Sequence, residues 1–135
     1  MCKFESNCDR CRQKIVKNIG QTIIDRQLRF YLACNCPFCN STLELDDIRF
    51  PEEYYRLILL SKQGKYRLQI NLEENVDKIA TMKAVRQTLQ LSIAQLTKLF
   101  DSTSIIVLSE GTKAEMEWLQ LLLLDAKVRS IVRSV

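Results

Sequence analysis

Two short stretches, Cys8-Asp9-Arg10-Cys11 and Cys36-Pro37-Phe38-Cys39, decide the fold of the first part of this chain. Each is a pair of cysteines separated by two residues, and 24 residues lie between the two pairs. The spacing lets two sulfurs of one tight loop approach a single ion, and two such loops complete a tetrahedral thiolate shell that suits zinc. We therefore predict a closed, structural Zn²⁺ site whose ligands are Cys8, Cys11, Cys36 and Cys39.

Other uses of these cysteines stay open at the level of sequence. A thioredoxin-like redox pair needs one C-x-x-C at a helix N-terminus, whereas here two pairs flank an apolar stretch. An iron–sulfur centre would use the same four thiolates. Cys34 is expected to be either a small buried apolar residue or an alternate ligand, because in an extended segment it shares a face with Cys36. Cys2, beside the terminus, is expected to be disordered.

The composition narrows the classes of function. Nearly half of the 135 residues are hydrophobic (47%), which argues against long disorder. The longest apolar stretch, residues 118–124, is too short for a membrane span, and the first ten residues hold no apolar signal segment, so we expect a cytoplasmic protein. Histidine is absent, which excludes histidine acid–base chemistry, Ser-His-Asp triads and histidine metal ligands. A net charge of +4 is small for a nucleic-acid binder.

Hydrophobic spacing predicts the elements around the cysteine pairs. Residues 14–24 have a helix-like spacing interrupted at Gly20, and residues 28–33 and 42–48 have the character of paired strands. Pro51 opens a helix over residues 52–61. These elements predict a zinc-ribbon-like unit over residues 1–61 with a trailing helix, followed by a hinge at residues 62–65.

The remainder, residues 65–135, predicts a separate α/β domain. Alternating apolar residues indicate strands over 65–72, 105–108 and 128–135. Helices are expected over 76–89, from the capping box at Ser92 to Phe100, and from the capping box at residues 112–115 to Ala126. The order β-α-α-β-α-β gives a three-stranded sheet, so the expected fold class is α+β: a small four-cysteine unit followed by this domain.

Residues 78–86, KIATMKAVR, look like the run K-[VI]-x-[VI]-I-K-x-[VI]-R, with Thr81 and Met82 as departures from it. The run, with Leu91, Ile93 and the Glu110-Gly111 turn, resembles the C-terminal domain of the bacterial ribosomal large-subunit stalk protein. The resemblance covers about residues 65–135. It implies a binding module whose first two helices recruit translation GTPases, with a surface carried over to Ile79, Ala80, Lys83 and Arg86. The chain has Gln90 and Ser92 where that family has glycines.

The residue pattern by itself indicates the same face of the first helix. Met82, Val85 and Leu89 lie on one arc and form a core stripe, while a neighbouring arc carries Val76, Ile79, Lys83 and Arg86. This neighbouring arc is either a solvated face with cations over apolar residues or a surface for a protein partner, which we favour.

The third helix of this domain is apolar nearly all round. We therefore expect Trp118, Leu121 and Leu124 to be buried against the zinc-binding unit or another chain, so residues 118–124 could mediate oligomerisation.

These features favour a non-catalytic protein-binding adaptor or assembly factor with a structural zinc site. The alternative is a ribosome- or nucleic-acid-associated factor that contacts RNA or a translation GTPase. A third hypothesis is a redox sensor that loses zinc on oxidation, with Cys34 or Cys2 as the responsive thiol. An enzyme is not expected, because the paired carboxylates lie at element ends where caps and solvated turns explain them.

Overall fold

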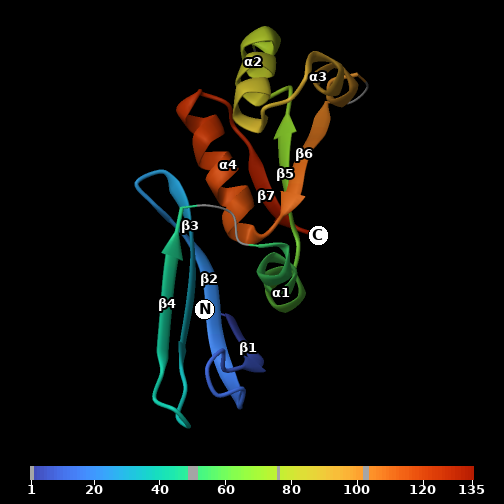
Figure 1. Ribbon diagram of the computed structural model, residues 1–135. Helices are drawn as coiled ribbons and strands as arrows, with labels where there is room; N and C mark the ends of the chain where they lie inside the picture. The colour runs from blue at the N-terminus through green and yellow to red at the C-terminus, as the bar shows by residue number, and fades with distance from the viewer. Residues whose placement is uncertain (1, 49–51, 76, 102–103) are drawn as a thin grey trace. The chain divides into compact units, whose positions relative to one another are not determined.

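The computed structural model describes residues 2–48, 52–75, 77–101 and 104–135. The chain divides into two compact units, Met1–Gln63 and Gly64–Val135. Each unit contains one antiparallel sheet, with four strands in the first and three in the second (Figure 1). The predicted α+β class is confirmed.

The first unit is a four-stranded meander followed by a helix. Its strands are β1 (Cys2–Asn7), β2 (Lys14–Ile24), β3 (Gln27–Asn35) and β4 (Thr42–Asp47), in the spatial order β1-β2-β3-β4. Asp25 and Arg26 join β2 to β3 with φ angles of 51° and 64°. Two left-handed residues in a two-residue loop match the right-handed twist of a hairpin, which explains the tight turn. The predicted strands over residues 28–33 and 42–48 are confirmed as β3 and β4.

The helix-like spacing predicted for residues 14–24 is wrong, because this segment is strand β2. Its buried face holds Ile15, Lys17 and Ile19, alternate residues of a strand, and Lys17 is only 4% exposed. Because Lys17 is polar, the hydrophobic residues of this segment do not alternate along the sequence, although the buried positions do alternate as in a strand. Gly20 pairs with Tyr31 on β3, and a Cβ at Gly20 would overlap the Tyr31 hydroxyl group. The glycine therefore makes room for the tyrosine ring within a continuous strand.

Helix α1 (Glu53–Gln63) packs on the sheet of the first unit. Its Leu59 is buried with Phe4, Ile19, Phe30 and Leu32. The Tyr55 ring lies 6.2 Å from the ring centroid of Phe4 and 5.7 Å from that of Phe30. This is a small core, so the unit needs stabilisation from elsewhere.

Strand β1 was not predicted, and the expectation that Cys2 is disordered is wrong. Cys2 is 5% exposed and belongs to the same apolar cluster as Phe4. It pairs with Ile19 on β2. The sequence of β1 does not predict a strand, because only two of its residues, Cys2 and Phe4, are buried apolar positions. Its partner β2 does not have the hydrophobic pattern of a strand either.

The second unit has the predicted order β-α-α-β-α-β. Its elements are β5 (Tyr66–Asn71), α2 (Lys78–Leu89), α3 (Ile93–Leu99), β6 (Ile105–Gly111), α4 (Lys113–Asp125) and β7 (Ile131–Ser134). The sheet has the order β6-β5-β7, with β5 in the centre and antiparallel to both neighbours. Leu68 and Ile70 of β5 are buried with Val85 of α2 and Leu123 of α4. Helices α2 and α4 therefore contribute to one core with the sheet.

Both predicted capping boxes are present. Ser92 caps α3, and its hydroxyl accepts a hydrogen bond from the Gln95 N–H while the Gln95 side chain accepts one from the Ser92 N–H. Thr112 and Glu115 make the same reciprocal pair at the start of α4. Helix α2 ends at Gln90 with φ 53° and ψ 49°, a left-handed conformation that glycine usually supplies at helix ends.

Candidate metal centre

The four predicted ligands lie on two loops at one end of the first sheet. Cys8 and Cys11 are in the connection between β1 and β2, and Cys36 and Cys39 are in the connection between β3 and β4. In an antiparallel meander the first and third connections lie at the same end. The long β2–β3 hairpin accounts for the 24 residues between the pairs.

The two loops have the same backbone construction. The Cys8 N–H donates to the carbonyl of Gln13 at 2.8 Å, and the Cys8 carbonyl accepts from the Arg12 N–H at 2.9 Å. In the second loop, the Cys36 N–H donates to Ser41 and its carbonyl accepts from Asn40, both at 2.9 Å.

In each loop, the residue after the second cysteine is left-handed. Its φ is 66° at Arg12 and 58° at Asn40. Asparagine adopts this conformation readily, whereas arginine does so rarely.

The four sulfurs form a compact group. All four Sγ atoms lie within 4.8 Å of one another. The Sγ atoms of Cys8 and Cys39 are 3.7 Å apart, and those of Cys11 and Cys36 are 3.5 Å apart. Zinc–sulfur bonds of about 2.3 Å in a tetrahedron place sulfurs roughly 3.8 Å apart, so this donor set fits a four-coordinate ion.

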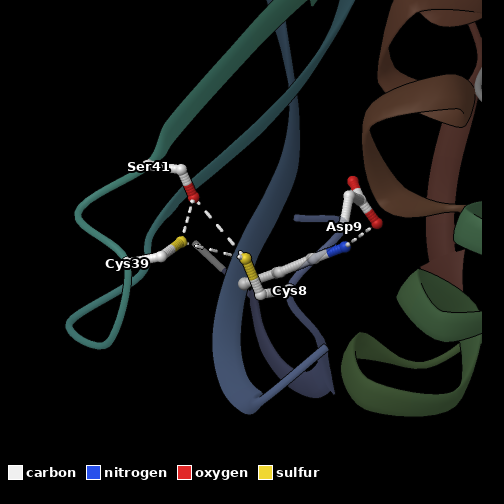
Figure 2. A network of polar contacts seen from close by, with 5 residues as sticks. Cys8, Asp9, Cys39 and Ser41 are labelled. Carbon is white, nitrogen blue, oxygen red and sulfur yellow. Dashed lines mark hydrogen bonds and ion pairs between the residues drawn. The ribbon is translucent and has the colours of Figure 1, made fainter. Parts of the chain in front are cut away.

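The surroundings favour the ionised form of two of the thiols. The backbone N–H of Cys11, with the Ser41 hydroxyl and the Arg10 backbone, lowers the pKa of Cys8 to about 5. The Ser41 hydroxyl and backbone also lower the pKa of Cys39. Figure 2 shows Ser41 directed at both sulfurs, 3.5 Å from Cys8 and 3.0 Å from Cys39.

Cys11 behaves in the opposite way. The Gln13 backbone lowers its pKa, but burial and the neighbouring sulfurs of Cys36, Cys8 and Cys39 outweigh this and raise it to about 12. Four sulfurs this close cannot all ionise without a cation among them. A metal ion among the four sulfurs would supply the positive charge that their full ionisation requires.

A buried cation lies beside the first loop. Lys17 of β2 points its ammonium at Asp9, with Nζ 3.5 Å from Oδ1. The lysine side chain is 5% exposed and the aspartate side chain is 76% exposed. Sequence reasoning missed Lys17, Gln13 and Ser41 as neighbours of the site. One indication of Gln13 and Ser41 is present in the sequence: each lies two residues after the second cysteine of its pair, Cys11 or Cys39.

The remaining two cysteines lie outside this group. Cys34 is half-buried and packs against the cluster that contains Cys8, Ile15 and Cys36. Burial raises the pKa of Cys34, with Lys17 opposing it. Among the described residues, the mutually close ligand atoms are those of the four predicted cysteines and do not include Cys34.

The predicted partner residues of α2 are accessible. Ile79, Ala80, Lys83 and Arg86 are all exposed, and Ile79 is 71% exposed. Val76 lies outside the described residues. On α4, Leu123 is buried in the core, Trp118 and Leu121 are half-buried, and Leu124 is 59% exposed. Of the three residues expected to face the core from α2, Val85 is buried, and Met82 and Leu89 are partly buried against the same core.

A scan against protein-family models and searches of curated proteins and of solved structures returned no match for this chain. Within the described ranges, none of the helices combines the length and apolar character needed to cross a bilayer. The four-cysteine group is thus the part of the candidate site that the geometry supports directly.

Proposed function

We propose that this chain is a non-catalytic adaptor or assembly protein that binds another protein through one face of α2, with zinc in the four-cysteine group as a structural element. The α2 face is defined as Ile79, Ala80, Lys83 and Arg86. The observation that carries the proposal is an isoleucine 71% exposed beside two exposed cations. An exposed aliphatic side chain beside an arginine is a combination found at protein interfaces, where arginine is enriched.

The charges around the α2 face are unbalanced. Lys78, Lys83, Arg86 and Lys98 are exposed, and no ion pair joins them to a described residue. The nearby acid, Asp77, caps α2 by accepting from the Ala80 N–H at 3.1 Å. A partner with acidic side chains around an apolar contact would complement this surface.

The neighbouring helix α3 also carries an exposed aliphatic side chain. Ile93, in the first turn of α3, is 66% exposed. Arg86 donates from Nε to the carbonyl of Leu91 at 3.3 Å, which holds its side chain against the α2–α3 connection. The two helices thus offer an arginine that is already positioned, which reduces the entropy lost when a partner binds.

The structural role of the metal follows from the ligand set. Four protein thiolates fill a tetrahedral shell and leave no position for a substrate or a water molecule. The proposal therefore assigns the metal to stability of the first unit and assigns recognition to the second.

The test is charge reversal on the α2 face. The double substitution Lys83→Glu and Arg86→Glu is expected to abolish co-purification of the partner from native cells, because it places like charges against the partner's acids. Mass spectrometry of tagged full-length chain identifies proteins retained by the wild type and lost by the variant. Their affinity for both chains is then measured with purified components.

A matched control carries the same change in charge elsewhere. Arg129→Glu with Arg133→Glu alters two other exposed cations of the second unit and is expected to leave co-purification unchanged. Both variants should keep the thermal unfolding profile of the wild type. Equal retention of the same proteins by wild type and the α2 variant would refute the α2 face as the binding surface. Ribosomal proteins or a GTPase in the eluate would favour the ribosome-associated alternative.

A further inference from the structure

The loops that hold the four cysteines also gather exposed side chains of two complementary kinds. The first loop and its flank carry Arg10, Arg12 and Lys14, and the second carries Phe38. All four residues are exposed. They are here called the knuckle surface. The 3.7 Å separation of the Cys8 and Cys39 sulfurs holds the two loops together, so cations and ring share one end of the sheet.

The cations of the knuckle surface are available to a ligand. No ion pair joins Arg10, Arg12 or Lys14 to any residue that the structure describes. The acid in the same loop, Asp9, already faces the ammonium of Lys17. With zinc bound, the ion and the four thiolates together carry a formal charge of about −2, and the three unpaired cations leave a small positive excess at this end.

Phe38 is the exposed aromatic of this end. Its side chain is 64% exposed, while Phe4 and Phe30 are buried in the core. Pro37 restricts the backbone before it, and Asn40 closes the loop in the left-handed conformation with φ 58°. The ring is thus presented on a constrained loop, as a flat apolar platform in water. Every nucleobase has a π-face that can stack on such a platform.

We propose that the knuckle surface binds single-stranded nucleic acid, with Arg10, Arg12 and Lys14 on successive phosphates and an unpaired base stacked on Phe38. Cationic side chains that follow the backbone, combined with an aromatic stacking platform, are the recurring chemistry of such sites. Two amides of the same loops, Gln13 and Asn40, are exposed and available to base edges. The described residues of the two cysteine loops form no helix, so insertion into a duplex groove is not part of the proposal.

This site is separate from the α2 face and does not depend on it. The knuckle surface lies in the first unit and the α2 face in the second. A chain that used both would connect a nucleic acid to a protein partner.

The test measures binding of the zinc-loaded full-length chain to fluorescent 12-nucleotide strands of uridine and of thymidine by anisotropy. Three phosphate contacts predict a slope of about −2 for log Kobs against log salt, since single strands give about −0.7 per contact. A preference for uridine would assign RNA, and equal binding would assign any single strand.

Two variants separate the two parts of the site. Phe38→Ala is expected to weaken binding roughly 5- to 100-fold with the salt slope unchanged, since it removes stacking and no charge. Arg10→Gln with Lys14→Gln is expected to reduce the slope by about 1.4, because two phosphate contacts are lost. Arg12 is left in place because its φ of 66° makes substitution there a change in backbone strain.

The control variant Arg129→Gln with Arg133→Gln removes the same charge from two exposed positions of the second unit and should bind within twofold of the wild type. Zinc content and thermal unfolding are measured for every variant. Absence of binding at 50 mM salt would overturn the proposal. So would binding that is insensitive to Phe38, or equal binding of polyglutamate, because either outcome would show charge attraction or an acidic protein ligand in place of base stacking.

Discussion

A chain stripped of metal by a chelator at pH 7 is expected to lose the β1–β4 sheet and to keep the fold of residues 64–135. The first unit has one small apolar core, formed around Phe4, Ile19, Phe30, Leu32 and Leu59. Its other buried cluster consists of Ile15 and the cysteines. A core of this size supplies at most about 3–5 kcal/mol, whereas structural zinc contributes on the order of 10 kcal/mol.

Amide NMR spectra of the full-length chain check this result residue by residue. In the stripped chain we expect amides of β1–β4 to move to random-coil positions, while those of β5, β6 and β7 keep their dispersion. One equivalent of Zn²⁺ should restore the β1–β4 signals. A stripped chain that retains a dispersed β1–β4 spectrum would contradict a structural metal. A coloured, iron-containing native protein would contradict zinc as the ion.

Cysteine substitutions provide a matched pair for the same prediction. Cys11→Ser removes one of the four clustered sulfurs and is expected to abolish stoichiometric metal binding and to unfold the first unit. Cys34→Ser changes a neighbouring half-buried thiol outside the group and should keep one metal per chain with a loss of about 1 kcal/mol or less. Loss of metal in the Cys34 variant would assign that thiol to the coordination shell.

The sequence predicted the elements of the second unit more accurately than those of the first. In the second unit the signals are local. Tyr66, Leu68 and Ile70 alternate along β5, and the capping boxes at Ser92 and Thr112 mark helix starts within four residues. Each element could therefore be predicted by itself, and the order β-α-α-β-α-β followed.

In the first unit the cysteine spacing predicted which residues come together, but not the strands that bring them there. Lys17 interrupts the apolar alternation of β2, and its burial depends on packing that no local window contains. Strand β1 is an edge strand that pairs with β2. When β2 is taken for a helix, β1 has no partner and is not predicted either. The polar neighbours of the sulfurs, such as Ser41, were missed because their position depends on a loop closed by tertiary contacts.

The second unit depends on a buried side chain that no motif marks. Asn75 is 7% exposed, and its Nδ2 donates to the carbonyls of Asn71 at 3.0 Å and of Arg129 at 3.1 Å. Its Oδ1 accepts from the Arg129 N–H at 3.0 Å. The side chain thus joins the segment before α2 to the segment before β7, across 54 residues of sequence.

Asn75→Ala is expected to lower the free energy of unfolding of the second unit by about 2–3 kcal/mol, because three hydrogen bonds are lost and buried backbone groups lose their partners. Denaturant unfolding monitored by fluorescence of the single tryptophan, Trp118 on α4, reports this unit. The matched control is Asn71→Ala, whose side chain accepts one exposed hydrogen bond from the Glu73 N–H. A loss of less than 1 kcal/mol is expected there, and equal losses would refute the buried role of Asn75.

The substitution Asn75→Asp replaces the donating amide by an oxygen and keeps the accepting oxygen. The pH dependence of the variant's stability therefore distinguishes the donated hydrogen bonds from the accepted one. An ionised carboxylate keeps the bond from the Arg129 N–H but faces the carbonyls of Asn71 and Arg129 without a proton to donate. Protonation restores one donor, so the folded state raises the pKa of the new carboxyl above its unfolded value. The folded state then binds more protons, and the deficit in stability relative to wild type grows as pH rises through the unfolded pKa. We expect a smaller deficit at pH 4 than at pH 7, and the opposite trend would show that the accepted bond dominates.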